Sequence, residues 1–152
     1  MRRSSTLMLA IVLLAATAAV AALAGQKGKG QSPAHGHSHS QAADGRKIPP
    51  YYENPNAVKE LPKTLPPEQF THQKVRAAYQ VAKDNPRLLM QLPCTCGCDR
   101  SDDHKSLLSC FTDQHGEYCG VCQDEALLAA ELHSKKVPIK KIRATIIEKY
   151  LY

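Results

Sequence analysis

Cysteines are the residues of this chain with the clearest capacity for chemistry, and they are few and clustered. The 152-residue sequence has six, three of them at alternate positions in the stretch LPCTCGC. Two more form a Cys-Gly-Val-Cys pair further on. The six are Cys94, Cys96, Cys98, Cys110, Cys119 and Cys122. Cysteines in such a pattern serve either as thiolate ligands of soft metal ions or as members of a disulfide framework.

The three cysteines of PCTCGC are predicted to face a common point. Alternate residues of an extended segment point to the same side, and Gly97 allows the backbone to bend around a bound group. Cysteines two residues apart make a poor disulfide with each other, because the small ring strains the preferred S–S geometry. The spacing therefore favours chelation by this strip, or long-range bridges from it to the three remaining cysteines.

The pair Cys119 and Cys122 is predicted to begin a helix. The helix dipole and free N–H groups at such a position stabilise a thiolate, which makes the sulfur a better ligand or nucleophile. CxxC pairs occur in metal knuckles and in thiol redox sites. With the first cluster about 20 residues upstream, the arrangement approaches the paired spacing of zinc sites. More than four cysteines would also suit a multinuclear Cu(I) cluster.

Histidines near the cysteines could extend the site. His104 follows Cys98 by six residues, and His115 precedes Cys119 by four. Each could ligate a metal, support a ligand by a hydrogen bond, or lie at the surface. A short His-rich tract at residues 35–39 could capture metal weakly or serve as a polar linker. We therefore predict a Cu(I) or Zn(II) site built from the six cysteines, with His104 and His115 as further candidate ligands.

The N-terminal pattern predicts export. Residues 1–24 combine two arginines, an uncharged apolar run and an Ala-Leu-Ala end, as in a cleaved signal peptide. The run is about 18 residues long, the lower limit for crossing a bilayer, so a membrane anchor is the alternative. Residues 25–50 are predicted to be a disordered, flexible tether, followed by one small domain over residues 51–152. We expect that domain outside the cytoplasm, in the periplasm or at the cell exterior.

Charge and motifs exclude several function classes. The net charge is +6, yet residues 51–152 carry 14 Lys and Arg against 13 Asp and Glu. A nucleic-acid-binding protein would gather its basic residues on the folded module, so no nucleic-acid partner is expected. The basic tether could lie near a membrane surface. There is no phosphate-binding glycine loop and no recognisable nucleophile motif, so we expect binding rather than catalysis.

Apolar periodicity predicts an all-α domain with cysteine-bearing loops. The periodic segments indicate helices over residues 68–83, 102–110 and 119–134, and a final helix that begins after Pro138. A short helical turn should open at Pro86. The last two helices should form a hairpin. The proline-rich segment before residue 68 is expected to be irregular.

The hexapeptide and the residues after it resemble a known family. The matching residues are Pro93–Cys98, His104–Leu107, Cys110, Phe111, His115, Gly116, Cys119 and Cys122. Over about residues 70 to 150 the chain is similar to the PCYCGC-motif proteins, bacterial exported or membrane-tethered domains of largely uncharacterised function. Thr95 stands where that motif has tyrosine, which should alter packing more than sulfur chemistry. The resemblance implies an extracytoplasmic bacterial protein whose cysteines act as a unit, with heavy-metal or copper handling.

Two alternatives accompany the metal hypothesis. Residues 119–150 are similar to the thiol-redox helical hairpin of cytochrome c maturation proteins, although Glu117 and Tyr118 replace the Leu-Arg before that motif. Cys119 or Cys122 would then attack a disulfide, and the other would resolve the intermediate. A disulfide-stapled interaction domain is the other alternative, because small exported domains with even cysteine numbers commonly contain disulfides. The leading hypothesis is metal buffering or delivery, with a metal-delivery or respiratory assembly protein as partner.

Overall fold

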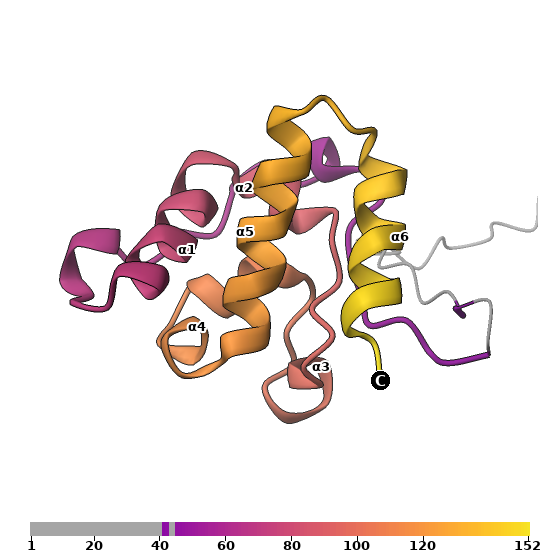
Figure 1. The fold of residues 1–152 in the computed structure, drawn as a ribbon, viewed down its shortest axis with the longest axis horizontal. Coiled ribbons are helices and arrows are strands. Elements are labelled where there is room, and N and C mark those ends of the chain that lie inside the picture. The colour runs from indigo at the N-terminus through magenta and orange to yellow at the C-terminus, as the bar shows by residue number, and fades with distance from the viewer. Residues whose placement is uncertain (1–40, 43–44) are drawn as a thin grey trace, which may run out of the picture. The chain divides into compact units, whose positions relative to one another are not determined.

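A computed structural model describes residues 41–42 and 45–152 (Figure 1). This part of the chain is helical, as predicted; no strand forms within the described residues, and an isolated bridge pairs Gln41 with Lys47. The predicted signal and most of the predicted tether, including the His-rich tract, lie outside the described residues. None of the helices within the described ranges is long and apolar enough to cross a membrane.

Helix α5 occupies the middle of the described domain, with α1 on one side and α6 on the other (Figure 1). The α-helices are α1 (Gln73–Asp84), α2 (Pro86–Met90), α3 (Cys98–Ser101), α4 (His115–Tyr118), α5 (Gly120–Ser134) and α6 (Ile139–Tyr150). Short 3-10 helices are η1 (Pro55–Ala57), η2 (Pro67–Gln69) and η3 (Leu107–Phe111). The segments between α2 and α5 therefore carry every cysteine except Cys122, which lies in the first turn of α5.

Helix α1 forms where apolar residues recur at helical spacing. Its buried face consists of Val75, Ala78, Tyr79 and Ala82. The helix begins later than residue 68, because η2 covers that position and Phe70, the residue after η2, has an extended backbone. The Phe70 ring stacks on Tyr79 with centroids 4.0 Å apart, and Tyr79 meets Phe111 edge-on at 5.1 Å. These aromatic contacts fix α1 against η3, which carries Cys110.

The segment from Cys98 to Cys110 does not form the single helix predicted over residues 102–110. Helix α3 ends at Ser101, and the chain becomes helical again only at η3. Asp103 lies between them at φ 56°, a left-handed conformation that interrupts a helix and that aspartate accepts more readily than most residues. As a result His104 turns into the interior, where it is 8% exposed.

The predicted C-terminal hairpin is present. Ile142 and Ile146 of α6 are fully buried, and α6 packs against α5. The buried face of α5 contains polar as well as apolar residues, namely Cys122, Gln123, Glu125, Ala126 and Ala129. Buried polar side chains require hydrogen-bond partners. Gln123 and Glu125 have theirs in the region between α2 and α5 that contains most of the cysteines.

The packed structure begins before Tyr51. Ile48, Tyr51 and Leu151 form a small buried cluster at the end of α6. Arg143 lies over the Tyr51 ring, 3.8 Å from its centroid, and its Nε donates to the Gln91 carbonyl oxygen at 2.8 Å. The last residues of the segment predicted as tether are thus held against α6.

The close approach of α4 to η3 can be tested at Gly116. A Cβ there would lie 2.8 Å from the Cys110 carbonyl oxygen and 2.9 Å from the Phe111 ring. Since neither group can move aside easily, Gly116→Ala should lower the free energy of unfolding by about 1–3 kcal/mol, measured by urea denaturation. Gly120→Ala is the matched control, because a Cβ at Gly120 meets no atom within 4 Å. Equal losses in the two variants would contradict the expected steric cause.

Candidate metal centre

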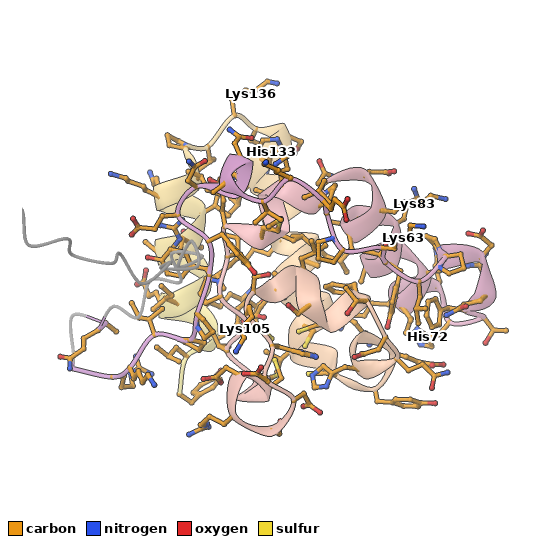
Figure 2. All side chains as sticks on the ribbon, turned by 180° about the vertical axis from the view of Figure 1, so that it is seen from behind. Lys63, His72, Lys83, Lys105, His133 and Lys136 are labelled. Carbon is orange, nitrogen blue, oxygen red and sulfur yellow. The ribbon has the colours of Figure 1, made fainter. Side chains whose placement is uncertain are left out.

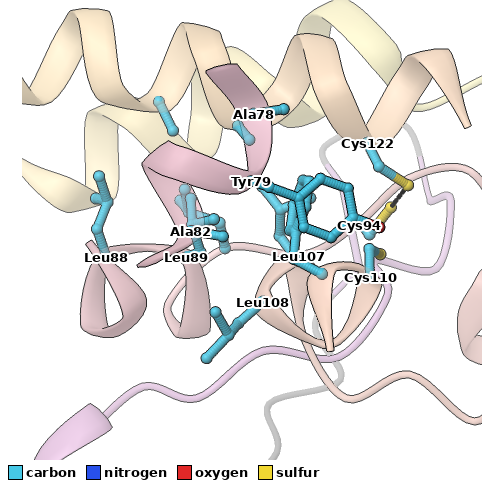
Figure 3. Packing of buried hydrophobic residues seen from close by; sticks show 14 of the residues in the cluster. Ala78, Tyr79, Ala82, Leu88, Leu89, Cys94, Leu107, Leu108, Cys110 and Cys122 are labelled. Atoms are coloured by element: carbon cyan, nitrogen blue, oxygen red, sulfur yellow. Dashed lines mark hydrogen bonds between the residues drawn. The ribbon is translucent and has the colours of Figure 1, made fainter. Parts of the chain in front are cut away.

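Six cysteine side chains from separate segments converge near the start of α5. Cys94 and Cys96 lie in the segment before α3, and Cys98 begins α3. Cys110 lies in η3, Cys119 occupies the N-cap position of α5, and Cys122 lies in the first turn of α5. Figure 3 shows the side chains of Cys94, Cys110 and Cys122 pointing toward one another from three different segments. No disulfide joins any of the six cysteines in this structure.

The sulfur atoms lie in contact with one another without being bonded. Cys94 Sγ is 3.3 Å from Cys122 Sγ and 3.4 Å from Cys96 Sγ. The Cys98 and Cys110 sulfurs are 3.6 Å apart, and those of Cys96 and Cys122 are 3.7 Å apart. A disulfide requires about 2.0 Å, whereas sulfurs placed about 2.3 Å from one tetrahedral ion lie about 3.8 Å from each other. The observed separations are close to those of thiolates around a shared ion.

Four overlapping sets of donor atoms among the described residues are close enough to hold a metal ion. Within each set, all ligand atoms lie within 4.8 Å of one another. The sets are Cys96, His115, Cys119 and Cys122; Cys98, His104, Cys110 and His115; Cys94, Cys110 and Cys122; and Cys94, Cys96 and Cys98. The eight candidate residues from the sequence are therefore brought together in one region, and each of them except His104 and Cys119 belongs to two of the sets.

The two histidines of the cluster are arranged alike. His104 places Nδ1 3.4 Å from a cysteine sulfur and Nε2 3.7 Å from Asp113 Oδ2. His115 places Nε2 3.5 Å from a cysteine sulfur and Nδ1 3.6 Å from Asp102 Oδ2. The two sulfurs are those of Cys110 and Cys96, respectively. Both carboxylates lie at ion-pair distance, beyond hydrogen-bond length, on the side of each ring away from the sulfur. This is the side on which histidine ligands of metal sites commonly have a carboxylate partner.

The turn that carries Cys94 and Cys96 is not the extended strip predicted from the sequence. Residues 95–96 form a turn, and Gly97 has a φ of 90°, in the left-handed region that glycine adopts without strain. Cys98 then enters α3 directly. The three sulfurs approach one another because the chain reverses into a helix, and not because alternate residues share one face of a strand.

Comparison with known families agrees with the sequence motif. The model of a family described as "Protein of unknown function with PCYCGC motif" matches residues 11–152. The chain belongs to this family. No curated protein and no solved structure matches it. In this PCYCGC protein, Thr95 occupies the tyrosine position of the motif, and its hydroxyl donates to the Tyr150 carbonyl oxygen at 3.0 Å. The substituted residue therefore anchors the turn to the end of α6.

Glu125 is a buried carboxyl beside the PCYCGC turn, and the sequence analysis did not identify it. The residue is 0% exposed, and its Oε1 accepts a hydrogen bond from the Thr95 backbone N–H at 2.9 Å. Its Oε2 has no hydrogen-bond partner among the described residues. Burial raises the pKa of Glu125 to about 8. One feature of the sequence could have identified Glu125: it lies one helical turn after Cys122, among positions that the helix would bury.

The thiols of the PCYCGC cluster differ in their affinity for protons. Hydrogen bonds from neighbouring thiols, first that of Cys119 and then those of Cys122 and Cys94, lower the pKa of Cys96. The pKa of Cys110 is lowered in the same way, first by Cys122. Hydrogen bonding to Cys110 raises the pKa of both Cys94 and Cys122. The metal-free cluster is therefore a network in which thiols donate to thiolates.

Both histidines of the cluster hold a proton more firmly than an isolated imidazole. The hydrogen bond with Cys110 raises the pKa of His104 to about 9. Burial opposes protonation of His115, but its hydrogen bond with Cys96 and the nearby thiolate charges raise its pKa to about 9. Because a histidine ligand must be neutral, a metal ion has to displace these protons. Metal binding by the PCYCGC cluster would thus be coupled to proton release.

Buried hydrogen bonds also position the segment that carries His115. Gln123 of α5 donates from Nε2 to the Gly116 carbonyl oxygen at 2.9 Å, which fastens α4 to α5. The Tyr79 hydroxyl donates to the Asp113 carbonyl oxygen at 2.6 Å. The aspartate behind His104 is therefore held from α1. These contacts connect the helical core of the PCYCGC protein to its two candidate imidazole ligands.

The other described histidines lie away from the cluster. His72 precedes α1, and His133 lies near the end of α5. Both side chains are exposed, and Figure 2 shows them at the periphery of the domain. The candidate centre of the described chain therefore uses only His104 and His115. The His-rich tract at residues 35–39 lies outside the described residues.

Proposed function

We propose that the protein binds Cu(I) or Zn(II) through the cysteine–histidine cluster and that it buffers or delivers the metal. The observation that carries this proposal is the contact of Cys94 with Cys122, whose free sulfurs are 3.3 Å apart although 28 residues separate them in sequence. Thiolates favour soft and borderline ions such as Cu(I) and Zn(II). The paired histidine and aspartate side chains support the same function, because histidine ligands of metal sites commonly have a carboxylate beside the nitrogen that faces away from the metal.

Partial exposure on one side of the cluster supports buffering or delivery rather than a closed structural site. Cys96 and Cys119 are partly exposed, whereas Cys94, Cys98, Cys110 and Cys122 are buried. A partner's thiol or imidazole group could therefore reach an ion at the exposed side. We propose an extracytoplasmic metal-delivery or respiratory assembly protein as that partner. The export pattern at residues 1–24 and the family resemblance support this location.

A thiol–disulfide protein acting through Cys119 and Cys122 is the second candidate. Cys119 is partly exposed and precedes the first turn of α5, as a nucleophilic CxxC cysteine does. Cys122, however, is fully buried and lies 3.3 Å from Cys94 and 3.7 Å from Cys96. A CxxC disulfide would compete with those contacts. Metal binding also gives a role to all six cysteines, whereas the redox function uses two.

Metal content and thiol state distinguish these candidates in one preparation. The full chain would be isolated from an extracytoplasmic fraction under native conditions, and its intact mass measured before and after denaturation in an alkylating reagent. We expect bound copper or zinc in the native protein and six alkylated thiols after denaturation. Three disulfides and no metal, in a protein that also fails to take up Cu(I) or Zn(II) after reduction, would contradict the proposal.

Cys98→Ser separates metal binding from CxxC chemistry. Cys98 lies 3.6 Å from Cys110, so its removal deletes a sulfur from the candidate centre. If the cluster binds metal as a unit, Cys98→Ser should weaken metal affinity at least about tenfold, as the loss of groups around a metal commonly does. A redox protein would instead retain the reduction potential of its Cys119–Cys122 pair in this variant. Competition with a chelator and thiol redox titration measure the two outcomes.

A further inference from the structure

The donor atoms of the cluster divide into two sets at different depths. The outer set consists of Cys96, His115, Cys119 and Cys122, and the inner set of Cys98, His104 and Cys110. His115 lies within reach of the inner donors as well, but its Nε2 faces Cys96 of the outer set at 3.5 Å. His104 faces Cys110 of the inner set at 3.4 Å. Each set therefore has its own imidazole, and each imidazole has its own aspartate.

Cys94 lies between the two sets. It forms one donor group with Cys110 and Cys122, and another with Cys96 and Cys98. Each of these two donor groups thus contains, besides Cys94, one sulfur of the inner set and one sulfur of the outer set. A thiolate in this position can bind one ion together with a sulfur of the inner set and a second ion together with a sulfur of the outer set. Cys94 itself is only 3% exposed, so water does not compete with this role.

The two sets differ in exposure. In the inner set, Cys98 is 1% exposed, His104 is 8% exposed and Cys110 is fully buried. In the outer set, Cys96, His115 and Cys119 are partly exposed, and only Cys122 is fully buried. An ion in the inner set can leave only if the surrounding core opens, whereas an ion in the outer set can be reached by a ligand from solution.

We propose that the centre holds two metal ions that share Cys94, an inner ion that is retained and an outer ion that is exchanged with partners. This inference rests on the proposed function, because it assigns the delivered metal to one part of the same centre. Exchange changes no oxidation state. A partner thiol transfers its proton to the departing Cys119 thiolate and binds the outer ion as a thiolate, so charge and protons balance.

Zinc release from the full chain tests this division. The reduced protein would be loaded with Zn(II), its stoichiometry measured by native mass spectrometry, and release followed after mixing with an excess of a chromogenic chelator. We expect two Zn(II) ions per chain, one of which is released at least about 100-fold more slowly, because its release requires local opening of the core. Parallel loading with Cu(I) shows whether the cluster binds a soft ion at all.

Two variants assign the kinetic phases. Cys119→Ser removes an outer ligand, and serine is a favoured residue at the helix N-cap position that Cys119 occupies, so the fold should be retained. It should remove the fast phase and preserve the slow one. His104→Gln removes an inner ligand and should abolish the slow phase while the fast phase persists. If His104→Gln fails to fold by circular dichroism, the Cys119→Ser result alone decides the assignment of the outer ion.

The outcomes separate this inference from the function on which it rests. Binding of neither Zn(II) nor Cu(I) would overturn both. Binding of Cu(I) without Zn(II), of a single Zn(II) ion, or of two ions released at one rate would overturn the two-ion inference alone. Loss of the slow phase in Cys119→Ser would also overturn it, because the outer ligand would then hold the retained ion.

Discussion

Removal of bound metal should lower the thermal unfolding midpoint by about 15 °C or more. Four of the six cysteines, Cys94, Cys98, Cys110 and Cys122, belong to the main hydrophobic core, so these candidate metal ligands are also core residues. A ligand present at about 1,000 times its dissociation constant stabilises the folded state by about 4 kcal/mol. For a domain of this size each kcal/mol shifts the midpoint by roughly 4–8 °C. Removal of the metal also leaves closely spaced thiolates with no cation between them, which further destabilises the folded state.

Differential scanning calorimetry before and after chelation measures this effect. The matched control is Cys98→Ser, which should show a much smaller response to the chelator because its centre lacks one sulfur. A second addition of metal to the chelated protein should restore the original midpoint. Equal midpoints for the loaded and chelated forms of the natural sequence would contradict a metal-stabilised core.

Replacement of the buried carboxyl in Glu125→Gln should remove a pH dependence from the stability of the metal-free domain. Burial raises the folded-state pKa of Glu125 from 4.5 to about 8. Folding therefore favours the protonated carboxyl, and this contribution is fully present below about pH 4.5 and is lost as the pH rises through about 8. The natural protein should lose on the order of 4 kcal/mol across this window relative to Glu125→Gln.

Urea denaturation of the two metal-free proteins at a series of pH values checks this result. Their stabilities should be similar near pH 4.5, where both side chains are neutral, and Glu125→Gln should be the more stable near pH 8.5. The thiols and imidazoles titrate in both proteins, so their contribution is largely common to the two curves. Glu148→Gln, which alters an exposed carboxyl of α6, should follow the natural protein. Parallel curves for Glu125→Gln and the natural protein would contradict a buried, neutral carboxyl.

The helical class could be predicted from the sequence because helix formation depends on local spacing. Val75, Ala78, Tyr79 and Ala82 recur at intervals of three and four residues, and all four are buried in α1. The start of α5 and the hairpin with α6 were predicted from the same kind of pattern. The helix over residues 102–110 was wrong, because the left-handed conformation at Asp103 and the packing of His104 into the interior are not visible in apolar periodicity.

The candidate donors could likewise be identified by residue type, but their supporting groups could not. Asp102 and Asp113 lie beside the two histidines only because the chain folds back between α3 and α4. Glu125 reaches the Thr95 backbone N–H across 30 residues of sequence. An aspartate or glutamate in a sequence is usually a solvated surface residue. Whether such a carboxylate lies beside a candidate ligand depends on the distance between two segments of the folded chain, and a local sequence pattern does not contain that distance.

The sequence by itself determined which residues are candidate metal ligands, since six cysteines and two histidines occur in a family motif with recognisable spacing. Only the tertiary structure decided which of these atoms meet. Cys94 contacts Cys122 and Cys96, His104 faces Cys110, and Cys119 remains partly exposed. The physical reason is that ligand type is a property of each residue, whereas coordination, burial and access depend on separations of a few ångströms between segments that are distant in the chain.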